Sequence, residues 1–127
     1  MIKKRRSFIV GLKSTILHFK EKKFLRKYKP WGVILFSRNI KTISQTKKLT
    51  DDIRKIFKDK KYPILIDQEG GRVNRLNNLI DCSNFTGEFF GNLYTKNIEK
   101  FNAYSKIFIN KISYLLDKIG VNINTVP

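Results

Sequence analysis

The chain has 127 residues, 41% of them hydrophobic, and its 27 Lys and Arg against 10 Asp and Glu give a formal net charge of +17. This composition excludes a disordered tail and suits one small globular domain. A single cysteine, Cys82, excludes an intrachain disulfide and favours reducing surroundings. The positive charge attracts polyanions in principle. However, the lysines look scattered as on solvated helix faces, and no RNP, zinc or helix-turn-helix signature accompanies them.

The N-terminus imitates a signal peptide only in its basic residues. The apolar run that follows, Phe8 to Leu12, is short, and Lys13 ends it before any small-residue cleavage site. No apolar run approaches the roughly 18 residues that a membrane span requires. We therefore expect a cytoplasmic chain with no membrane partner.

Apolar runs and helical patterns alternate along the first 40 residues. Residues 7–12 predict a short buried strand, and residues 18–29 predict a helix that Pro30 ends. Residues 31–36 are uninterrupted apolar side chains, which is typical of a strand buried on both faces of a parallel sheet. The polar residues 37–42 predict a loop.

A second helix is predicted after this loop. Thr42 and Gln45 have the spacing of a capping box at its start. The side chains that follow at steps of three and four form one stripe, made of Ile43, Thr46, Leu49, Ile53, Ile56 and Phe57. Residues 64–66 are then a short buried strand, and Asp67 stands at its C-terminal end.

The last third of the chain predicts a loop, a helix and a strand. Residues 77–97 have no clean period and hold Gly87 and Gly91, which predicts a long loop that includes a short helical turn. The clearest helical stripe follows, made of Ile98, Phe101, Tyr104, Phe108, Ile112, Leu115 and Ile119. Gly120 is placed where a left-handed C-terminal cap favours glycine. Residues 121–127 predict a final strand.

This order of elements predicts an α/β fold with parallel strands and right-handed crossovers. Two complete folds use it, an open doubly wound sheet and a (β/α)8 barrel. In both of them ligands bind at the C-terminal ends of the strands. We therefore expect Asp67 at this edge, together with Arg38 and Asn39, which follow the strand ending at Phe36.

The segment ILIDQEGGRVNRL, residues 64–76, concentrates polar side chains directly after a buried strand. In an extended backbone Asp67 and Glu69 point the same way, roughly 6.6–7 Å apart. Paired carboxylates serve glycoside hydrolysis and also bind hard metal ions, and Arg72 and Arg75 can neutralise them. A purely structural ion-pair cluster that orders a turn has the same composition. The Gly-Gly-Arg sequence matches neither common phosphate-binding glycine pattern.

The same segment resembles the D-Q-E-G-G-R-V-x-R signature of the β-N-acetylhexosaminidases of glycoside hydrolase family three, bacterial cytoplasmic enzymes that recycle cell-wall peptidoglycan. Three further stretches agree in order and spacing. FIVGL occupies the place of the first strand, and PWGVILFSRNI resembles the family's G-x-I-L-F-x-R-N strand and loop. IGVNINTVP resembles the strand that continues into P-V-L-D. The resemblance runs from Phe8 to the last residue.

The resemblance implies that residues 1–127 form a single partial domain, the N-terminal half of a (β/α)8 TIM-type barrel with about four parallel strands. It implies removal of terminal β-linked N-acetylglucosamine with retention of configuration, with no metal and no organic cofactor. Asp67 and Arg75 would bind the sugar. The residues that would support them in the motif and the neighbouring loop are Gln68, Glu69, Gly70, Gly71, Arg72, Arg38 and Asn39.

No catalytic residue is expected in this chain. The family's K-H-x-P-G-H-G loop with the acid/base histidine, and its aspartate nucleophile, correspond to positions after Pro127. The only histidine, His18, is expected on the first helix, away from the C-terminal edge.

We therefore expect a truncated product or one part of a split enzyme, inactive alone, that binds an N-acetylglucosamine-containing saccharide. A complementing C-terminal half, or a second copy, would pair with its open strand edges. One alternative is a non-catalytic sugar-binding or accessory protein. The other, with less support, is a basic nucleic-acid-binding protein.

Overall fold

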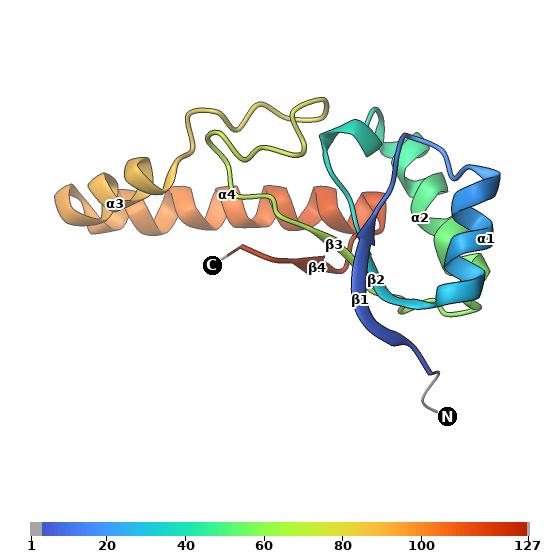
Figure 1. The fold of residues 1–127 in the computed structure, drawn as a ribbon. Helices are drawn as coiled ribbons and strands as arrows, with labels where there is room; N and C mark the ends of the chain where they lie inside the picture. Colours follow the sequence, from blue (N-terminus) through green and yellow to red (C-terminus); the bar gives the residue numbers. More distant parts are fainter. Residues whose placement is uncertain (1–3, 127) are drawn as a thin grey trace.

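The computed structural model describes residues 4–126 and contains one sheet of four parallel strands (Figure 1). The strands lie in chain order, as β1 (Arg6–Gly11), β2 (Pro30–Ile34), β3 (Ile64–Ile66) and β4 (Ile123–Asn124). The helices are α1 (Phe19–Tyr28), α2 (Ile43–Phe57), α3 (Gly87–Lys96) and α4 (Ile98–Ile119), with a short 3-10 turn, η1, at Ser37–Asn39. The parallel order is as the sequence predicts. Within residues 4–126 no helix is both long and apolar enough to cross a membrane.

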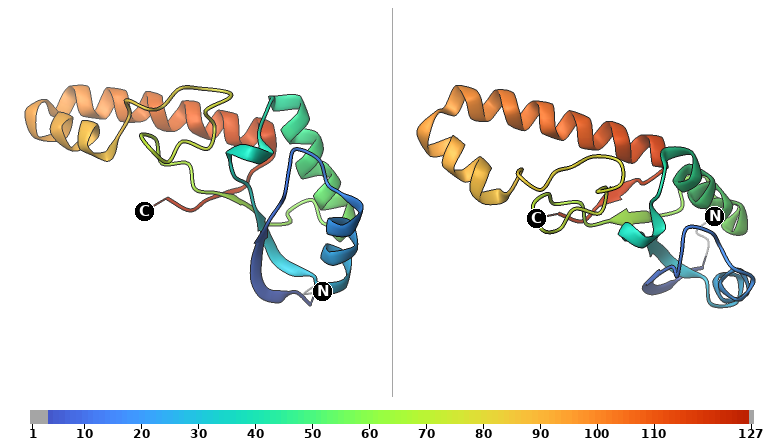
Figure 2. Two further views of the ribbon diagram at one scale, coloured as in Figure 1. Left: turned by 45° about the horizontal axis from the view of Figure 1, so that its top comes forward. Right: turned by 90° about the horizontal axis from the view of Figure 1, so that it is seen from above.

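One face of this sheet packs against the helices. Val33 and Ile64 are neighbours across β2 and β3, and both are fully buried. They share a core with side chains from three helices, namely Leu25 of α1, Leu49 and Ile53 of α2, and Ile112, Leu115 and Ile119 of α4. Figure 2 shows these helices along the outer side of the curved sheet, with the inner side open. Ile9 of β1 keeps 44% of its surface exposed.

This arrangement separates the two folds that the element order allows. A doubly wound sheet reverses its strand order at a switch point and carries helices on both faces. A sheet in chain order, with its helices on one face, is the arrangement of a (β/α)8 barrel. The four strands are thus part of a barrel wall, and among the described residues β1 and β4 are its open edges.

The caps of α2 and α4 follow the sequence pattern closely. Thr42 accepts a hydrogen bond from the backbone N–H of Gln45 at 3.1 Å. The Gln45 side chain accepts from the N–H of Lys41, one residue before the N-cap, so the expected capping box is shifted by one position. Gly120 closes α4 with a φ of +79°, as predicted.

The prediction of a long loop over residues 77–97 is wrong for its second half, which forms α3. Thr86 starts this helix by accepting a hydrogen bond from the N–H of Phe89 at 2.9 Å. The rings of Phe85 and Phe90 lie 5.5 and 5.3 Å from that of Phe108 in α4. None of the α3 residues is buried, and the helix packs against α4 away from the sheet (Figure 1). Its half-buried stripe of Phe89, Phe90 and Leu93 is short, and Gly87 and Gly91 read as loop signals, which is why the pattern missed it.

Candidate functional site

An ion pair between Asp67 and Arg75 lies at the C-terminal end of β3. Arg75 donates from Nε to Oδ1 at 2.8 Å and from Nη2 to Oδ2 at 2.9 Å, a bidentate contact. Hydrogen bonding by Arg75 lowers the pKa of Asp67, and the same contact raises the pKa of Arg75. Asp67 is therefore an anion at neutral pH and has no proton to donate.

The side chain of Gln68 holds the segment that carries Arg75. It is 2% exposed, and its Oε1 accepts hydrogen bonds from the N–H groups of Arg75 at 2.8 Å and Leu76 at 3.0 Å. Its Nε2 donates to Oδ1 of Asn74 at 3.0 Å. The position of the Arg75 guanidinium thus depends on a buried amide beside Asp67. The family signature predicts Gln68 as a supporting residue, and in the structure its side chain fixes the backbone of Arg75 and Leu76.

Asn124 of β4 is a further site residue, which the sequence analysis missed. Its Oδ1 accepts from the N–H of Gln68 at 3.0 Å, and its Nδ2 donates to the carbonyl of Gln68 at 3.2 Å. The end of β4 therefore lies beside Asp67, as the predicted strand order requires. The only sequence signal for this role was that residue 124 is an asparagine near the end of a strand in which apolar and polar side chains alternate.

Gly70 and Gly71 turn the chain after the strand. Their φ angles are +98° and +58°, which L side chains rarely adopt. A Cβ on Gly70 would lie 2.3 Å from the carbonyl oxygen of Phe85, and one on Gly71 would lie 2.9 Å from Cγ2 of Thr86. Gly71 also donates its N–H to the carbonyl of Cys82 at 2.8 Å. Both glycines are needed for the chain to pass under the 82–86 segment.

Glu69 and Arg72 are exposed, and neither side chain forms a hydrogen bond or ion pair within residues 4–126. Glu69 contributes its backbone N–H, which donates to the carbonyl of Val73 at 3.0 Å. Its charge is a minor cause of the raised pKa of Arg75. Asp67 and Glu69 thus have different surroundings. The described residues contain no group of three or more His, Cys, Asp or Glu that could hold a metal ion.

Arg38 is connected to the ion pair through the ring of Phe36. The guanidinium carbons of Arg38 and Arg75 lie 4.6 and 5.3 Å from the centre of this ring. A Cβ on Gly11 would lie 3.1 Å from Nη2 of Arg38 and 3.2 Å from the Phe36 ring, so glycine leaves room for both. Arg38 therefore lies at the same edge as Asp67, as predicted. The sequence analysis placed Phe36 at the end of a buried strand, and nothing in the sequence indicated that it contacts site residues.

Asn39 joins the loops that follow β1 and β2. It is fully buried, and its Nδ2 donates to the carbonyls of Leu12 at 3.1 Å and Ser14 at 2.8 Å. Its Oδ1 accepts from the N–H of Phe36 at 2.9 Å. Asn39 therefore holds the edge together and does not face solvent.

The expected location of His18 is wrong. His18 is the N-cap of α1 and ends the loop that leaves the C-terminal end of β1, so it lies toward the same edge as Asp67. A strand's C-terminal end and the start of the next helix are adjacent in a βαβ unit, which places this residue there. Its Nε2 shares a hydrogen bond with Oγ of Ser14 at 2.8 Å.

Cys82 lies in the core, and burial raises the pKa of its thiol. The thiolate is the reactive form of cysteine. A buried thiol with a raised pKa stays protonated, so Cys82 is a core side chain and not a nucleophile.

The chain matches no protein-family model. Among curated proteins it is 32% identical to beta-hexosaminidase A of Pseudoalteromonas piscicida over 108 residues, which cover 81% of this chain and 17% of that protein. It is 44% identical to a beta-hexosaminidase of Alkalilimnicola ehrlichii over 69 residues, which cover 53% of this chain and 19% of that protein. The chain thus spans about a fifth of the length of the curated relatives it matches.

Solved structures show the same fold. Native NagZ from Neisseria gonorrhoeae superposes with a TM-score of 0.79 at 24% identity, over 97% of this chain and 36% of that one. A glycoside hydrolase family 3 beta-N-acetylglucosaminidase from Paenibacillus superposes with a TM-score of 0.70 at 27% identity, over 92% of this chain and 22% of that one. NagZ in complex with N-trifluoroacetyl-D-glucosamine superposes with a TM-score of 0.51 at 35% identity, over 56% and 21%.

Proposed function

We propose that this chain belongs to the β-N-acetylhexosaminidases of glycoside hydrolase family three and that residues 1–127 are the N-terminal part of their catalytic barrel. In this proposal it contributes a contact surface for a terminal β-linked N-acetylglucosamine. The reaction is retaining hydrolysis of the glycosidic bond, in the recycling of cell-wall peptidoglycan in the cytoplasm. The names of the relatives and the sugar bound to NagZ support this substrate class.

The observation that carries the proposal is the bidentate pair of Asp67 and Arg75 at the strand end. The two side chains are 27% and 28% exposed, so the pair is ordered and still open to a ligand. A carboxylate oxygen accepts more than one hydrogen bond, and a guanidinium has five N–H donors. Asp67 can therefore accept from sugar hydroxyls while Arg75, held in place by Gln68, donates to the same sugar.

The proposal assigns no catalytic step to this chain. Retaining hydrolysis needs a nucleophile and a separate acid/base on two sides of the glycosidic bond. Asp67 is held in its ionised form by Arg75, so it is no acid. Glu69 comes from the same short turn. In the complete barrel, further strands would pair with the outer edges of β1 and β4.

Sugar binding and hydrolysis are measured separately on the purified chain. Titration with N-acetylglucosamine, followed by NMR, should shift backbone signals around residues 67–75. Asp67→Ala should weaken this binding about tenfold, because a charge-assisted hydrogen bond is lost. Glu99→Ala, which removes an exposed carboxylate in the first turn of α4, is the matched control and should bind as the unchanged chain does.

A chromogenic β-N-acetylglucosaminide should show no release of its leaving group. Clear turnover that Asp67→Ala abolishes would overturn the non-catalytic part of the proposal. Unchanged binding by Asp67→Ala would make the ion pair purely structural.

A further inference from the structure

The positive charge of the chain is concentrated in its first half. Residues 1–61 hold 20 of the 27 Lys and Arg and 4 of the 10 Asp and Glu. Residues 62–127, which include Asp67 and Arg75, hold 7 Lys and Arg and 6 Asp and Glu. A general bias toward lysine would raise the number of basic residues in both halves alike. The positive charge is therefore distributed unevenly along the chain: it lies in and around β1, in α1, in the loop after β2, in α2 and in the turn after α2.

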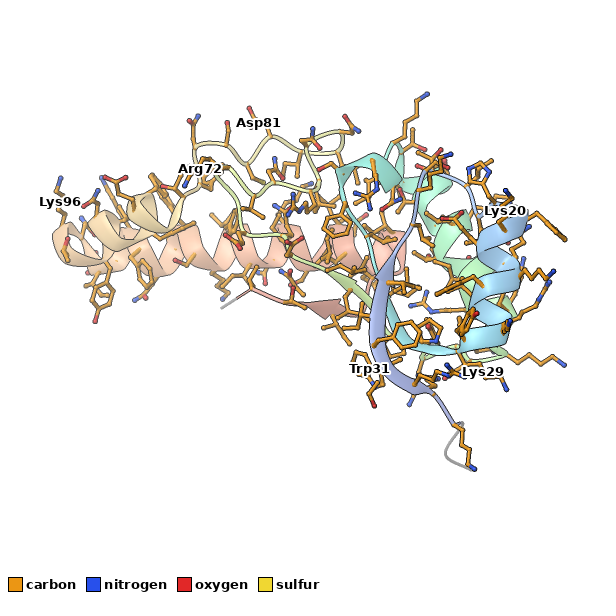
Figure 3. The ribbon with its side chains drawn as sticks, viewed as in Figure 1. Lys20, Lys29, Trp31, Arg72, Asp81 and Lys96 are labelled. Carbon is orange, nitrogen blue, oxygen red and sulfur yellow. The ribbon has the colours of Figure 1, made fainter. Side chains whose placement is uncertain are left out.

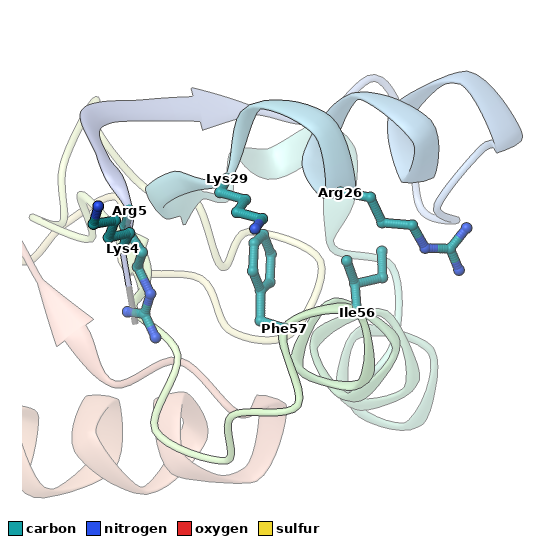
Figure 4. Close-up of a pocket in the computed structure, with 6 residues that line it drawn as sticks. All are labelled: Lys4, Arg5, Arg26, Lys29, Ile56 and Phe57. Carbon is teal, nitrogen blue, oxygen red and sulfur yellow. The ribbon is translucent and has the colours of Figure 1, made fainter. Parts of the chain in front are cut away.

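Within this half, four basic residues contribute to the lining of a hollow of about 290 Å³; Figure 4 shows Arg5 and Lys29 on two sides of it, with the end of the Arg26 side chain turned outward. The hollow is lined by Lys4, Arg5, Arg26, Lys29, Ile56 and Phe57. They come from the residues before β1, the end of α1 and the end of α2. Lys29 precedes β2, so the hollow lies at the N-terminal ends of the strands, opposite Asp67. Figure 3 shows Lys29 at the lower side of the molecule and Arg72 at the upper side.

One wall of the hollow is rigid. Arg5 forms an ion pair with Asp59, and its guanidinium carbon lies 4.8 Å from the centre of the Tyr62 ring. Tyr62 is fully buried and stacks on Phe57 with ring centres 3.9 Å apart. The Arg5 guanidinium is therefore held in place before any ligand arrives.

The other three cations, Lys4, Arg26 and Lys29, form no ion pair with a described residue. Asp51 and Asp52 are paired with lysines of their own helix. The C-terminal ends of α1 and α2 point to this region and contribute roughly half a negative charge each. The four cations are offset by the carboxylate of Asp59 and by the partial negative charges of the two helix ends. A net charge of about +2 is therefore left around the hollow.

We propose that this hollow binds the phosphate groups of a small polyphosphate, either free or as part of a nucleotide. A phosphate group carries about −1.5 to −2 at neutral pH and accepts several hydrogen bonds, which matches the charge left around the hollow. Arg and Lys are the side chains that bind phosphate. The hollow is about the size of a small-ligand site, and Ile56 and Phe57 give it an apolar side. The site is independent of the proposed sugar surface.

Two double variants of α1 test the site with equal loss of charge. Arg26→Gln with Lys29→Gln removes two cations from the hollow. Lys20→Gln with Lys23→Gln removes two exposed cations nearer the start of the same helix; Figure 3 shows Lys20 and Lys29 at its two ends. Lys29 has a φ of +48°, and Gln keeps a Cβ there, so the backbone cost is unchanged. Melting of both variants by circular dichroism checks that they fold.

Calorimetric titration of the full chain with inorganic tripolyphosphate and with adenosine triphosphate gives the affinities. The variant in the hollow should bind at least about tenfold more weakly, and the control less than about twofold. Tighter binding of adenosine triphosphate assigns a nucleotide, and equal binding assigns a free polyphosphate. Equal weakening by both variants would show diffuse attraction and overturn the site. Retention of a single-stranded oligonucleotide while neither small probe binds would overturn it as well.

Discussion

The side-chain amide of Asn124 forms two hydrogen bonds with the backbone of Gln68, accepting from its N–H and donating to its carbonyl. These bonds extend the pairing of β3 with β4 beyond the last residue of β3. Gln68 in turn binds the N–H groups of Arg75 and Leu76. The amide side chains of Gln68 and Asn124 thereby fix the turn that carries Arg75 and the distant strand β4 beside Asp67.

Gln68→Met should destabilise the fold by about 2–4 kcal/mol. The change keeps the side-chain volume but leaves the N–H groups of Arg75 and Leu76 without their acceptor, and an unsatisfied buried donor costs roughly 1–3 kcal/mol. Urea unfolding measures the difference. Arg72→Gln, at an exposed position, should stay within about 0.5 kcal/mol. A Gln68 variant as stable as this control would show that water replaces the lost acceptor.

Gly70→Ala and Gly91→Ala should change stability in opposite directions. Gly70 has a φ of +98° and faces the Phe85 carbonyl, so alanine there should cost at least about 2 kcal/mol through strain and collision. Gly91 lies inside α3, and a Cβ there meets nothing within 4 Å. Alanine at Gly91 should stabilise by roughly 0.5–1 kcal/mol. Thermal unfolding of the two variants compares them, and equal effects would contradict the turn geometry.

The ion pair at the strand end should make stability depend on acid pH. The pKa of Asp67 is lowered in the folded chain, so its contribution is present above the unfolded value of about 4 and is lost as pH falls through the folded value. For a partly exposed pair it amounts to at most about 1 kcal/mol. The melting temperatures of the unchanged chain and of Asp67→Asn should differ at pH 6 and converge by about pH 2. A constant difference would mean that Asp67 does not titrate as part of the pair.

The open edges of the sheet should make the purified chain associate. β1 and β4 each pair with one neighbouring strand in the described residues, and an unpaired strand edge invites another chain. Sedimentation should show a mass that rises with concentration. Replacing Ile123 with proline, which cannot donate a hydrogen bond, should weaken association through β4. A stable monomer at all concentrations would contradict this use of the edges.

The alternation of apolar runs and helical stripes predicted four parallel strands and three of the four helices, because each of these elements buries a stripe or a run. The short helix α3 has only a short, half-buried stripe and contains two glycines, so its sequence indicated a loop. Asp67, Arg38 and Asn39 were predicted at one edge because the C-terminal ends of parallel strands meet there, and Arg75 was added by the family resemblance. The DQEGGR segment could be recognised because its polar groups are contiguous in the chain.

The sequence by itself determined the βαβ order, the caps at Thr42 and Gly120, and the location of Asp67 at a strand end. These depend on contacts within a few residues, which local chemistry decides. Only the tertiary structure decided that Asn124 holds Gln68, that Phe36 lies between Arg38 and Arg75, and that basic residues of three segments surround one hollow. Such contacts join residues up to 56 positions apart, and the packing of the helices on the sheet brings them together.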